Sequence, residues 1–121
     1  MTVAPEARLA LCVARGKTAQ QAAIDAWLRE RSDAGSGARL AVVAEGAFFE
    51  LVVPPQFALE RLAAGCVCCV GLLPLRVTLT RLLRTFRPDR VLLLLADASH
   101  VERLQALVAS GQLGVTLEQE S

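Results

Sequence analysis

Three of the four cysteines in this 121-residue chain fall within four consecutive positions, in the sequence Gly65-Cys66-Val67-Cys68-Cys69. Thiolates this close together can offer up to three soft ligands to one Zn²⁺ or Cu(I) ion, with little chain entropy left to lose. The competing interpretation is that the cysteines only pack as small apolar side chains, as isolated buried cysteines commonly do. Because the cluster lies in a glycine-flanked segment, we favour metal or redox chemistry, with zinc or another thiophilic divalent ion as the cofactor.

The tripeptide Gly16-Lys17-Thr18 is a second candidate for chemistry. It follows a predicted strand and opens a predicted helix, which is where a P-loop uses backbone N–H groups and a lysine to hold phosphates. A complete P-loop reads G-x-x-x-x-G-K-[ST], and Leu11 occupies the position of its first glycine. Taken alone, the tripeptide is a weak signal of a phosphate site.

Cys12, Glu45 and His100 are further candidates, because each ends or follows a predicted strand. Ligands of open α/β sheets bind beyond the carboxyl ends of the strands, so these side chains could complete the coordination of a metal held by the cysteine cluster. Each also has a simpler interpretation. Cys12 is equally suited to the core, Glu45 to the surface or to supporting a ligand, and His100 to capping a helix.

The segments around these residues alternate between strand and helix patterns. Apolar runs predict strands at Arg8–Val13, Arg39–Val43, Phe48–Val53, Val91–Leu95 and Val115–Leu117. Helical spacing predicts helices at Lys17–Arg31, Leu75–Phe86 and Ser99–Ala109, and a short helical turn leading into a strand at Gln56–Leu62. The alternation predicts one α/β domain over residues 1–121, with a mostly parallel sheet of four to six strands and helices on both faces.

The order of these elements resembles a known family. The N-terminal domain of CobW proteins has a similar order. In this chain a strand is followed by Gly16-Lys17-Thr18 and then by a second strand. G-C-x-C-C comes next, before a helix and a strand that begins at Asp89-Arg90. CobW proteins are metal-handling P-loop GTPases, related to the GTPases that insert nickel into urease and hydrogenase. The resemblance extends from about Arg8 to Gly114, and the complete G-C-x-C-C element is its most specific mark. It implies a P-loop NTPase-like fold with a nucleotide site at the tripeptide and a metal site at the cysteines.

Other positions depart from the family pattern. The family's P-loop resembles G-F-L-G-A-G-K-T-T, whereas here Leu11 and Ala14 replace two glycines, and Arg15 stands where a small residue lets the backbone close on phosphate. In the same alignment Leu94 takes the place of an acidic residue that helps to hold the metal–nucleotide, and Asp97 that of a glycine. The guanine-reading N-K-x-D and the family's C-terminal domain are also missing from the sequence. Phosphoryl transfer needs these parts together, so the resemblance predicts a truncated, degenerate member that has no catalytic residues and does not use GTP and Mg²⁺.

Composition limits the partners and the compartment. Thirteen basic and twelve acidic residues give a net charge of +1, which offers no electrostatic case for nucleic acid or an anionic membrane. The first fifteen residues lack the pattern of a secretory signal, and no apolar run reaches the roughly 20 residues that span a bilayer. Clustered rather than widely spaced cysteines are typical of metal or redox sites in reducing compartments. We therefore predict a cytoplasmic protein.

Two classes of function stay open. A metal-binding accessory or metallochaperone-like protein would sequester zinc, or deliver it to a metalloprotein client, through the cysteine cluster. An interaction or regulatory module would use the same fold for assembly, with no bound metal. Nucleotide binding without turnover is a third alternative. Because a shortened sheet leaves an edge strand exposed, a homodimer is the expected assembly.

Overall fold

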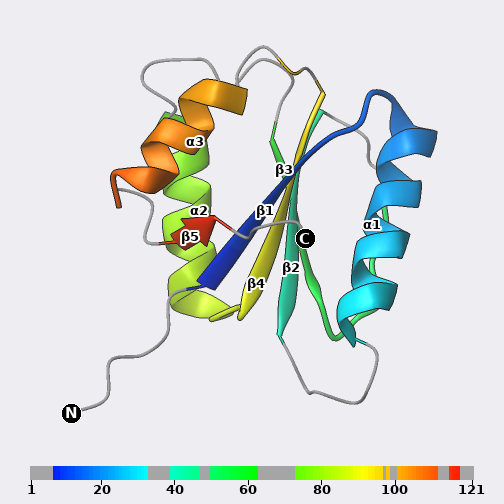
Figure 1. The fold of residues 1–121 in the computed structure, drawn as a ribbon. Coiled ribbons are helices and arrows are strands. Elements are labelled where there is room, and N and C mark those ends of the chain that lie inside the picture. The colour runs from blue at the N-terminus through cyan, green and yellow to red at the C-terminus, as the bar shows by residue number, and fades with distance from the viewer. Residues whose placement is uncertain are drawn as a thin grey trace.

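A computed structural model describes residues 7–32, 39–46, 50–62, 73–96, 98, 101–111 and 115–117. Strands and helices alternate along most of the chain, as predicted (Figure 1). The elements are β1 (Ala7–Val13), α1 (Lys17–Ser32), β2 (Leu40–Glu45), β3 (Ala58–Leu62), α2 (Leu73–Thr85), β4 (Arg90–Leu95), α3 (Val101–Ala109) and β5 (Val115–Leu117). The cysteine cluster, Asp97, Ser99 and His100 lie outside the described residues.

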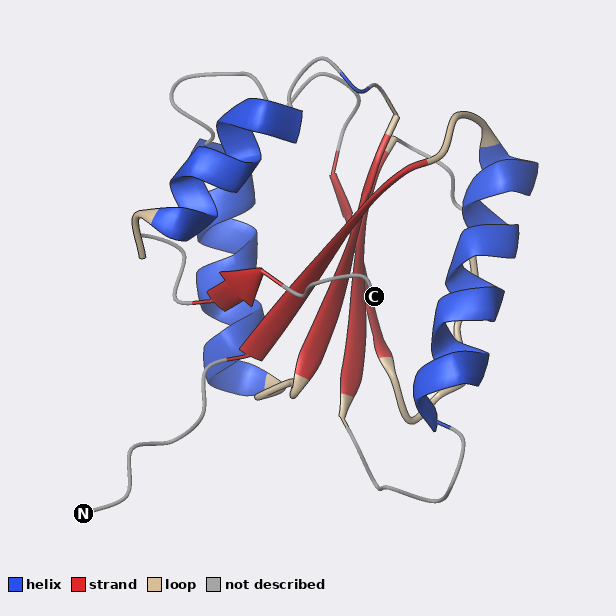
Figure 2. Ribbon diagram, viewed as in Figure 1, coloured by secondary structure: helices blue, strands red, loops and turns tan. Residues whose placement is uncertain are grey.

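The strands form one parallel sheet in the order β3-β2-β4-β1-β5 (Figure 2). β4 is the central strand, and its Leu92 pairs with Ala10 of β1 on one side and with Val42 of β2 on the other. β1 and β2 are therefore not neighbours, although only one helix separates them in the sequence. The expected α/β fold with a parallel sheet is confirmed.

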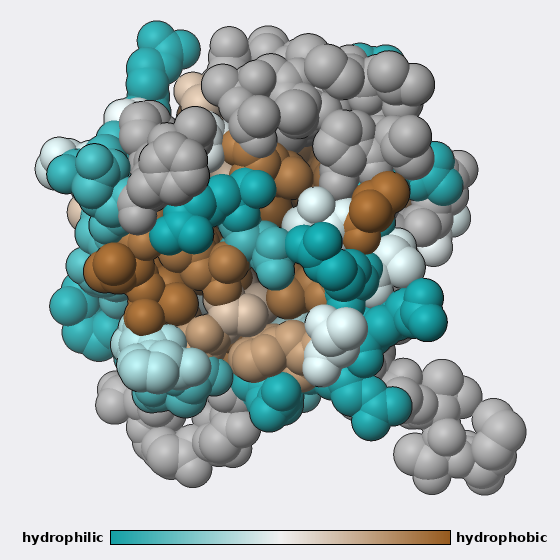
Figure 3. Space-filling view, turned by 180° about the vertical axis from the view of Figure 1, so that it is seen from behind, coloured by the Kyte–Doolittle hydropathy of each residue, from teal (hydrophilic) through white to brown (hydrophobic). Residues whose placement is uncertain are grey.

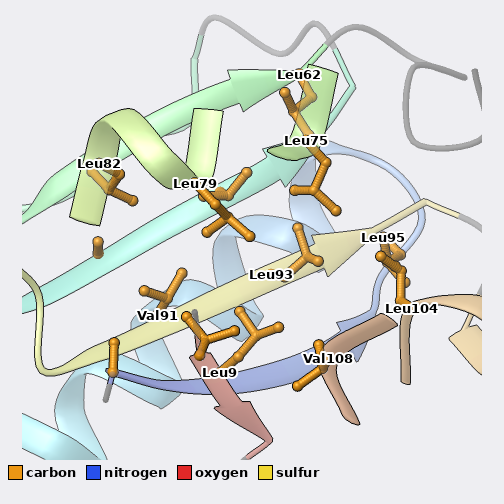
Figure 4. Packing of buried hydrophobic residues seen from close by; sticks show 14 residues of the cluster. Leu9, Leu62, Leu75, Leu79, Leu82, Val91, Leu93, Leu95, Leu104 and Val108 are labelled. Carbon is orange, nitrogen blue, oxygen red and sulfur yellow. The ribbon is translucent and has the colours of Figure 1, made fainter. Parts of the chain in front are cut away.

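Helices cover both faces of the sheet, with α1 on one face and α2 and α3 on the other (Figure 1). Successive side chains of a strand point to opposite faces, so each strand contributes alternately to two separate cores. The core beneath α1 contains Ala10, Ala14, Ile24, Trp27, Leu28, Leu40, Val42, Ala44, Leu51, Leu92 and Leu94. The core beneath α2 and α3 includes Leu9, Val43, Leu62, Leu75, Leu79, Leu82, Val91, Leu93, Leu95, Leu104 and Val108 (Figure 4). The run Val91–Leu95 is buried at every position, as a central strand covered on both faces requires.

The end of α2 shows why the helix stops where the sequence predicts. The backbone N–H groups of Phe86 and Arg87 both donate to the carbonyl oxygen of Leu82, at 2.9 and 3.2 Å. Arg87 adopts a left-handed φ of 55°, which ends the helical path, and Pro88 cannot continue it.

Asp89 connects the three inner strands at their amino ends. Its backbone N–H donates to the Arg39 carbonyl oxygen at 2.7 Å, and its carboxylate accepts from the Arg39 N–H at 2.8 Å. Its own carbonyl oxygen accepts from the Arg8 N–H at 3.0 Å. Asp89 thereby fixes the start of β4 between the starts of β2 and β1.

The expected strand at Phe48–Val53 is wrong for the described residues 50–53. Leu51 is fully buried in the core beneath α1, but the backbone of this segment bonds to side chains instead of to a strand. The Gln21 carboxamide donates to the Val52 carbonyl oxygen at 3.0 Å and accepts from the Val52 N–H at 2.9 Å. Arg61 donates to the Leu51 carbonyl oxygen at 2.8 Å. The apolar run reflects burial of one side chain and not sheet pairing, whereas the turn and strand expected at Gln56–Leu62 appear as a turn followed by β3.

Candidate functional site

The carboxyl ends of β1, β2, β3 and β4 lie along one edge of the sheet because these strands are parallel. This edge is where ligands bind in open α/β sheets, and sequence reasoning placed every candidate residue beside it. Among the described residues it is formed by the connection after β1, by Glu45 and Gly46, by Leu62, and by Leu95 and Ala96.

The connection from β1 to α1 is only three residues long, Ala14 to Gly16. β1 pairs with β4 as far as Val13, opposite Leu95, and the Ala14 N–H then donates to the Leu95 carbonyl oxygen at 2.9 Å. A P-loop needs free backbone N–H groups at these positions to surround phosphate. In this chain the N–H of Ala14 already donates to β4, as an extension of the pairing between β1 and β4.

Gly16, Lys17 and Thr18 begin α1. Gly16 has a φ of +91°, which a residue with a side chain adopts only with strain, and its carbonyl oxygen accepts the first helical hydrogen bond, from the Gln20 N–H at 3.0 Å. Lys17 and Thr18 are exposed, and they line an open groove of about 550 Å³ together with Gln21, Ala22, Asp25, Glu50 and Val52. The groove thus runs between α1 and the segment after β2, away from the connection itself.

Gln20 is the residue at this edge that sequence reasoning missed. Its side chain is completely buried, and its Nε2 donates to the carbonyl oxygens of Ala14, at 3.1 Å, and Glu45, at 3.0 Å. The available signal was the spacing of Gln20, Ile24 and Leu28, which places a polar side chain on the buried stripe of α1. Ala19 and Ala22, which are also at helical spacing, are exposed and do not belong to this stripe.

Glu45 lies at the end of β2 and is only 3% exposed. One carboxylate oxygen, Oε1, accepts from the backbone N–H of Ala96 at 2.9 Å, just beyond the end of β4. The alternation along β2 puts Val43 in the core beneath α2 and α3, and Glu45 therefore on the same face. This carboxylate bridges two neighbouring strands at the edge and is not the ordinary surface acid of the simpler interpretation.

Cys12 lies on the other face of the sheet. It is partly buried and packs against the core beneath α1, as Ala10 and Ala14 do. Cys12 and Glu45 thus point to opposite faces and are not arranged to bind one ion together. The described residues contain no group of three His, Cys, Asp or Glu side chains that could hold a metal. The three clustered thiols suit a thiophilic ion by their chemistry, but they and His100 lie outside the described residues.

Comparisons with protein-family models, with curated proteins and with solved structures find no match to this chain. None of the helices, as far as the structure describes them, has the length and apolar character needed to cross a bilayer.

Replacing Glu45 by alanine is expected to lower the free energy of unfolding by about 1–3 kcal/mol, because the partly buried Ala96 N–H loses its acceptor. Urea denaturation measures the change. Glu50→Ala is the matched control, since Glu50 is an exposed acid in the segment that follows, and it should stay within about 0.5 kcal/mol of the wild type. A Glu45→Ala variant as stable as this control would contradict a structural role for the carboxylate.

Proposed function

We propose that this protein is a metal-binding accessory protein, metallochaperone-like, built on a degenerate CobW-type GTPase domain. In this proposal Cys66, Cys68 and Cys69 bind one thiophilic divalent ion, with zinc preferred, and GTP hydrolysis is lost. Zinc bound by three thiolates keeps a fourth tetrahedral position for water, His100 or a residue of a client protein. An open position favours transfer of the ion over permanent storage.

The observation that carries the proposal is the order of the strands at the carboxyl edge. Leu62, which ends β3, pairs with Glu45, and Glu45 binds the residue that follows β4. Cys66 is four residues beyond Leu62 in the sequence, and His100 is four residues beyond Ala96. Four residues span at most about 14 Å, so the chain length permits both to reach a common site at this edge. This supports a shared site at one edge.

Of the two described candidates for the metal site, Glu45 fits this proposal and Cys12 does not. Glu45 is on the face of the sheet that α2 covers, and α2 begins shortly after the cysteine cluster in the sequence. Its bond to the Ala96 N–H suits a residue that supports the site, or one that exchanges this bond for a metal. Cys12 belongs to the other face, so we do not include it among the ligands.

Loss of GTP hydrolysis is supported by the connection between β1 and α1. The Ala14 N–H is already bonded within the sheet, and Arg15 donates to the Ala96 carbonyl oxygen at 3.5 Å. Lys17 and Thr18 line the groove between α1 and the segment after β2. A phosphate bound by the Ala14 N–H would first have to break the hydrogen bond between this group and the Leu95 carbonyl oxygen.

We propose a cytoplasmic protein whose partners are a metalloprotein client and a second copy of this chain. Val13, Val52 and Val77 are the exposed large apolar side chains of the described residues, and Figure 3 shows apolar surface among hydrophilic residues on the face seen from behind. β3 lies at one edge of the sheet, where a second copy could cover it.

Two measurements test the proposal together. Titration against a chromogenic zinc chelator, under reducing conditions and without an affinity tag, should give one zinc per chain. GTP turnover at saturating Mg²⁺ should be undetectable. A rate on the order of 1 s⁻¹, within the ordinary range of enzymes, would restore a GTPase. If no zinc binds, the metal-free interaction module becomes the better description.

A further inference from the structure

The side chains of Gln20 and Glu45 form hydrogen bonds at the carboxyl edge of the sheet, one from each face. Gln20 comes from α1 and bonds the carbonyl oxygens of Ala14 and Glu45, at the ends of β1 and β2. The Glu45 side chain bonds the Ala96 N–H after β4. These side-chain hydrogen bonds join the ends of three strands, and β4 lies between the other two.

The edge that they join is the one at which an open α/β sheet leaves a crevice. The connections that follow β1 and β2 run over the α1 face, and those that follow β3 and β4 lead to helices on the other face. Neighbouring strands whose connections separate in this way open a space beyond their carboxyl ends, and ligands bind there. In this chain, the side chains of Gln20 and Glu45 bind three backbone groups at that edge: the carbonyl oxygens of Ala14 and Glu45, and the N–H of Ala96.

Ala14 shows the effect most directly. Its N–H donates to Leu95 and its carbonyl oxygen accepts from Gln20, so both of its backbone groups are bonded within the domain. The neighbouring Gly46 N–H donates to the Leu62 carbonyl oxygen at 2.6 Å. These backbone groups of Ala14 and Gly46 therefore already have their partners without a bound anion.

We propose that Gln20 is an internal latch that closes the β1–α1 connection and makes its conformation independent of any bound phosphate. A carboxamide suits this task because one NH₂ group carries two donors, which here reach two carbonyl oxygens. A leucine has no donor, and a glutamate would set its charge against both carbonyl oxygens. The Oε1 atom of Gln20 has no hydrogen-bond partner among the described residues, so the side chain acts through Nε2.

The inference deepens the loss of nucleotide chemistry proposed above and does not depend on metal binding. It assigns that loss in part to Gln20. The connection lacks two glycines, and this side chain of the following helix also holds it closed.

The test is hydrogen exchange of backbone amides by NMR, with the variant Gln20→Met. Methionine keeps the volume and apolar stem of glutamine but removes the amide. In the wild type the N–H groups of Ala14, Gly46 and Ala96 should be protected. In Gln20→Met, exchange at Ala14 and Gly46 should become roughly tenfold faster or more, because two buried carbonyl oxygens lose their donor. Gln21→Met is the matched control, since it removes the same group one residue further along α1.

Equal protection of Ala14 and Gly46 in the wild type and Gln20→Met would overturn the inference, as would an equally large effect of Gln21→Met at these two amides.

A second measurement uses the wild type alone and does not depend on how the variant folds. Titration with millimolar inorganic phosphate, and then with Mg²⁺-GTP, should leave the amide signals of Gly16, Lys17 and Thr18 in place. If these amide signals shift and the shifts saturate with added phosphate or Mg²⁺-GTP, the β1–α1 connection binds phosphate and the inference is wrong. Zinc titration of Gln20→Met should match the wild type, so failure of the latch is distinguishable from failure of the metal site.

Discussion

Serine in place of Cys66 is expected to weaken zinc binding roughly 100-fold or more. Structural zinc sites with four ligands hold the ion by about 10–16 kcal/mol at neutral pH, which is about 2.5–4 kcal/mol for each ligand. A serine hydroxyl at this position stays protonated and is a poor ligand for zinc, so the site should lose about one such contribution. Competition against a chromogenic chelator, with the wild type and the variant side by side, gives the ratio of the dissociation constants.

The matched control is Cys12→Ser. It changes the same atoms at a cysteine that packs beneath α1, on the other side of the sheet from Glu45, and zinc affinity should stay within about twofold of the wild type. Equal affinities of the wild type and Cys66→Ser would contradict the metal site, and a large effect of Cys12→Ser would contradict the choice of ligands.

The pH dependence of the same titration counts the thiols that bind. Each thiol sheds a proton to become a ligand, so zinc affinity should fall as pH falls, and more steeply in the wild type than in Cys66→Ser. Separate Cys68→Ser and Cys69→Ser variants address a geometric question, because adjacent side chains often point apart. If only one of them weakens binding, the ion has two cysteine ligands and its remaining ligands come from Glu45, His100 or water.

Replacing Leu93 by alanine is expected to lower the free energy of unfolding by about 2–5 kcal/mol. Leu93 is fully buried on β4, and it packs in the core beneath α2 and α3 (Figure 4). Truncation removes buried methyl groups and leaves a cavity that a central strand, hydrogen-bonded on both sides, has little freedom to fill. Urea denaturation of the purified domain measures the loss.

Val77→Ala provides the control for this experiment. Val77 is on α2, above the same core, but its side chain is 55% exposed. The substitution should change stability by about 0.5 kcal/mol or less, because a surface site loses little contact and alanine is the better helix former. A Leu93→Ala loss below about 1 kcal/mol would contradict the central position of β4.

Most of the architecture could be predicted because it depends on patterns that local physics enforces. Val91–Leu95 is apolar at five consecutive positions, and few structures other than a doubly covered strand bury such a run. The stripe of Leu75, Leu79 and Leu82 predicted α2 for the same reason, and Pro88 predicted its end. Each of these signals lies within a single helix or strand, so it does not depend on contacts with the rest of the chain.

The interactions at the carboxyl edge could not be predicted in this way, because they join residues far apart in the sequence. Gln20 reaches Glu45 across 25 positions, and Glu45 reaches Ala96 across 51. The misassigned strand near Leu51 has the same origin: a buried leucine and two valines favour a strand locally, but Gln21 and Arg61 provide the hydrogen bonds that an extended segment needs. Which backbone groups remain for a ligand is decided by such long-range contacts.

The central position of β4 also determines when the sheet can form during synthesis. β1 and β2 leave the ribosome first, but neither is the other's partner, and the strand that lies between them begins at Arg90. A nascent chain that ends at Asp89 therefore holds β1 and β2 with their inner edges unpaired, and both are rich in apolar side chains. Joining them to β4 requires contacts between residues about eighty positions apart for β1 and about fifty apart for β2, which is slow and leaves strand edges open to wrong partners. The last quarter of the chain, which begins with β4, thus converts a set of separate segments into one folding unit.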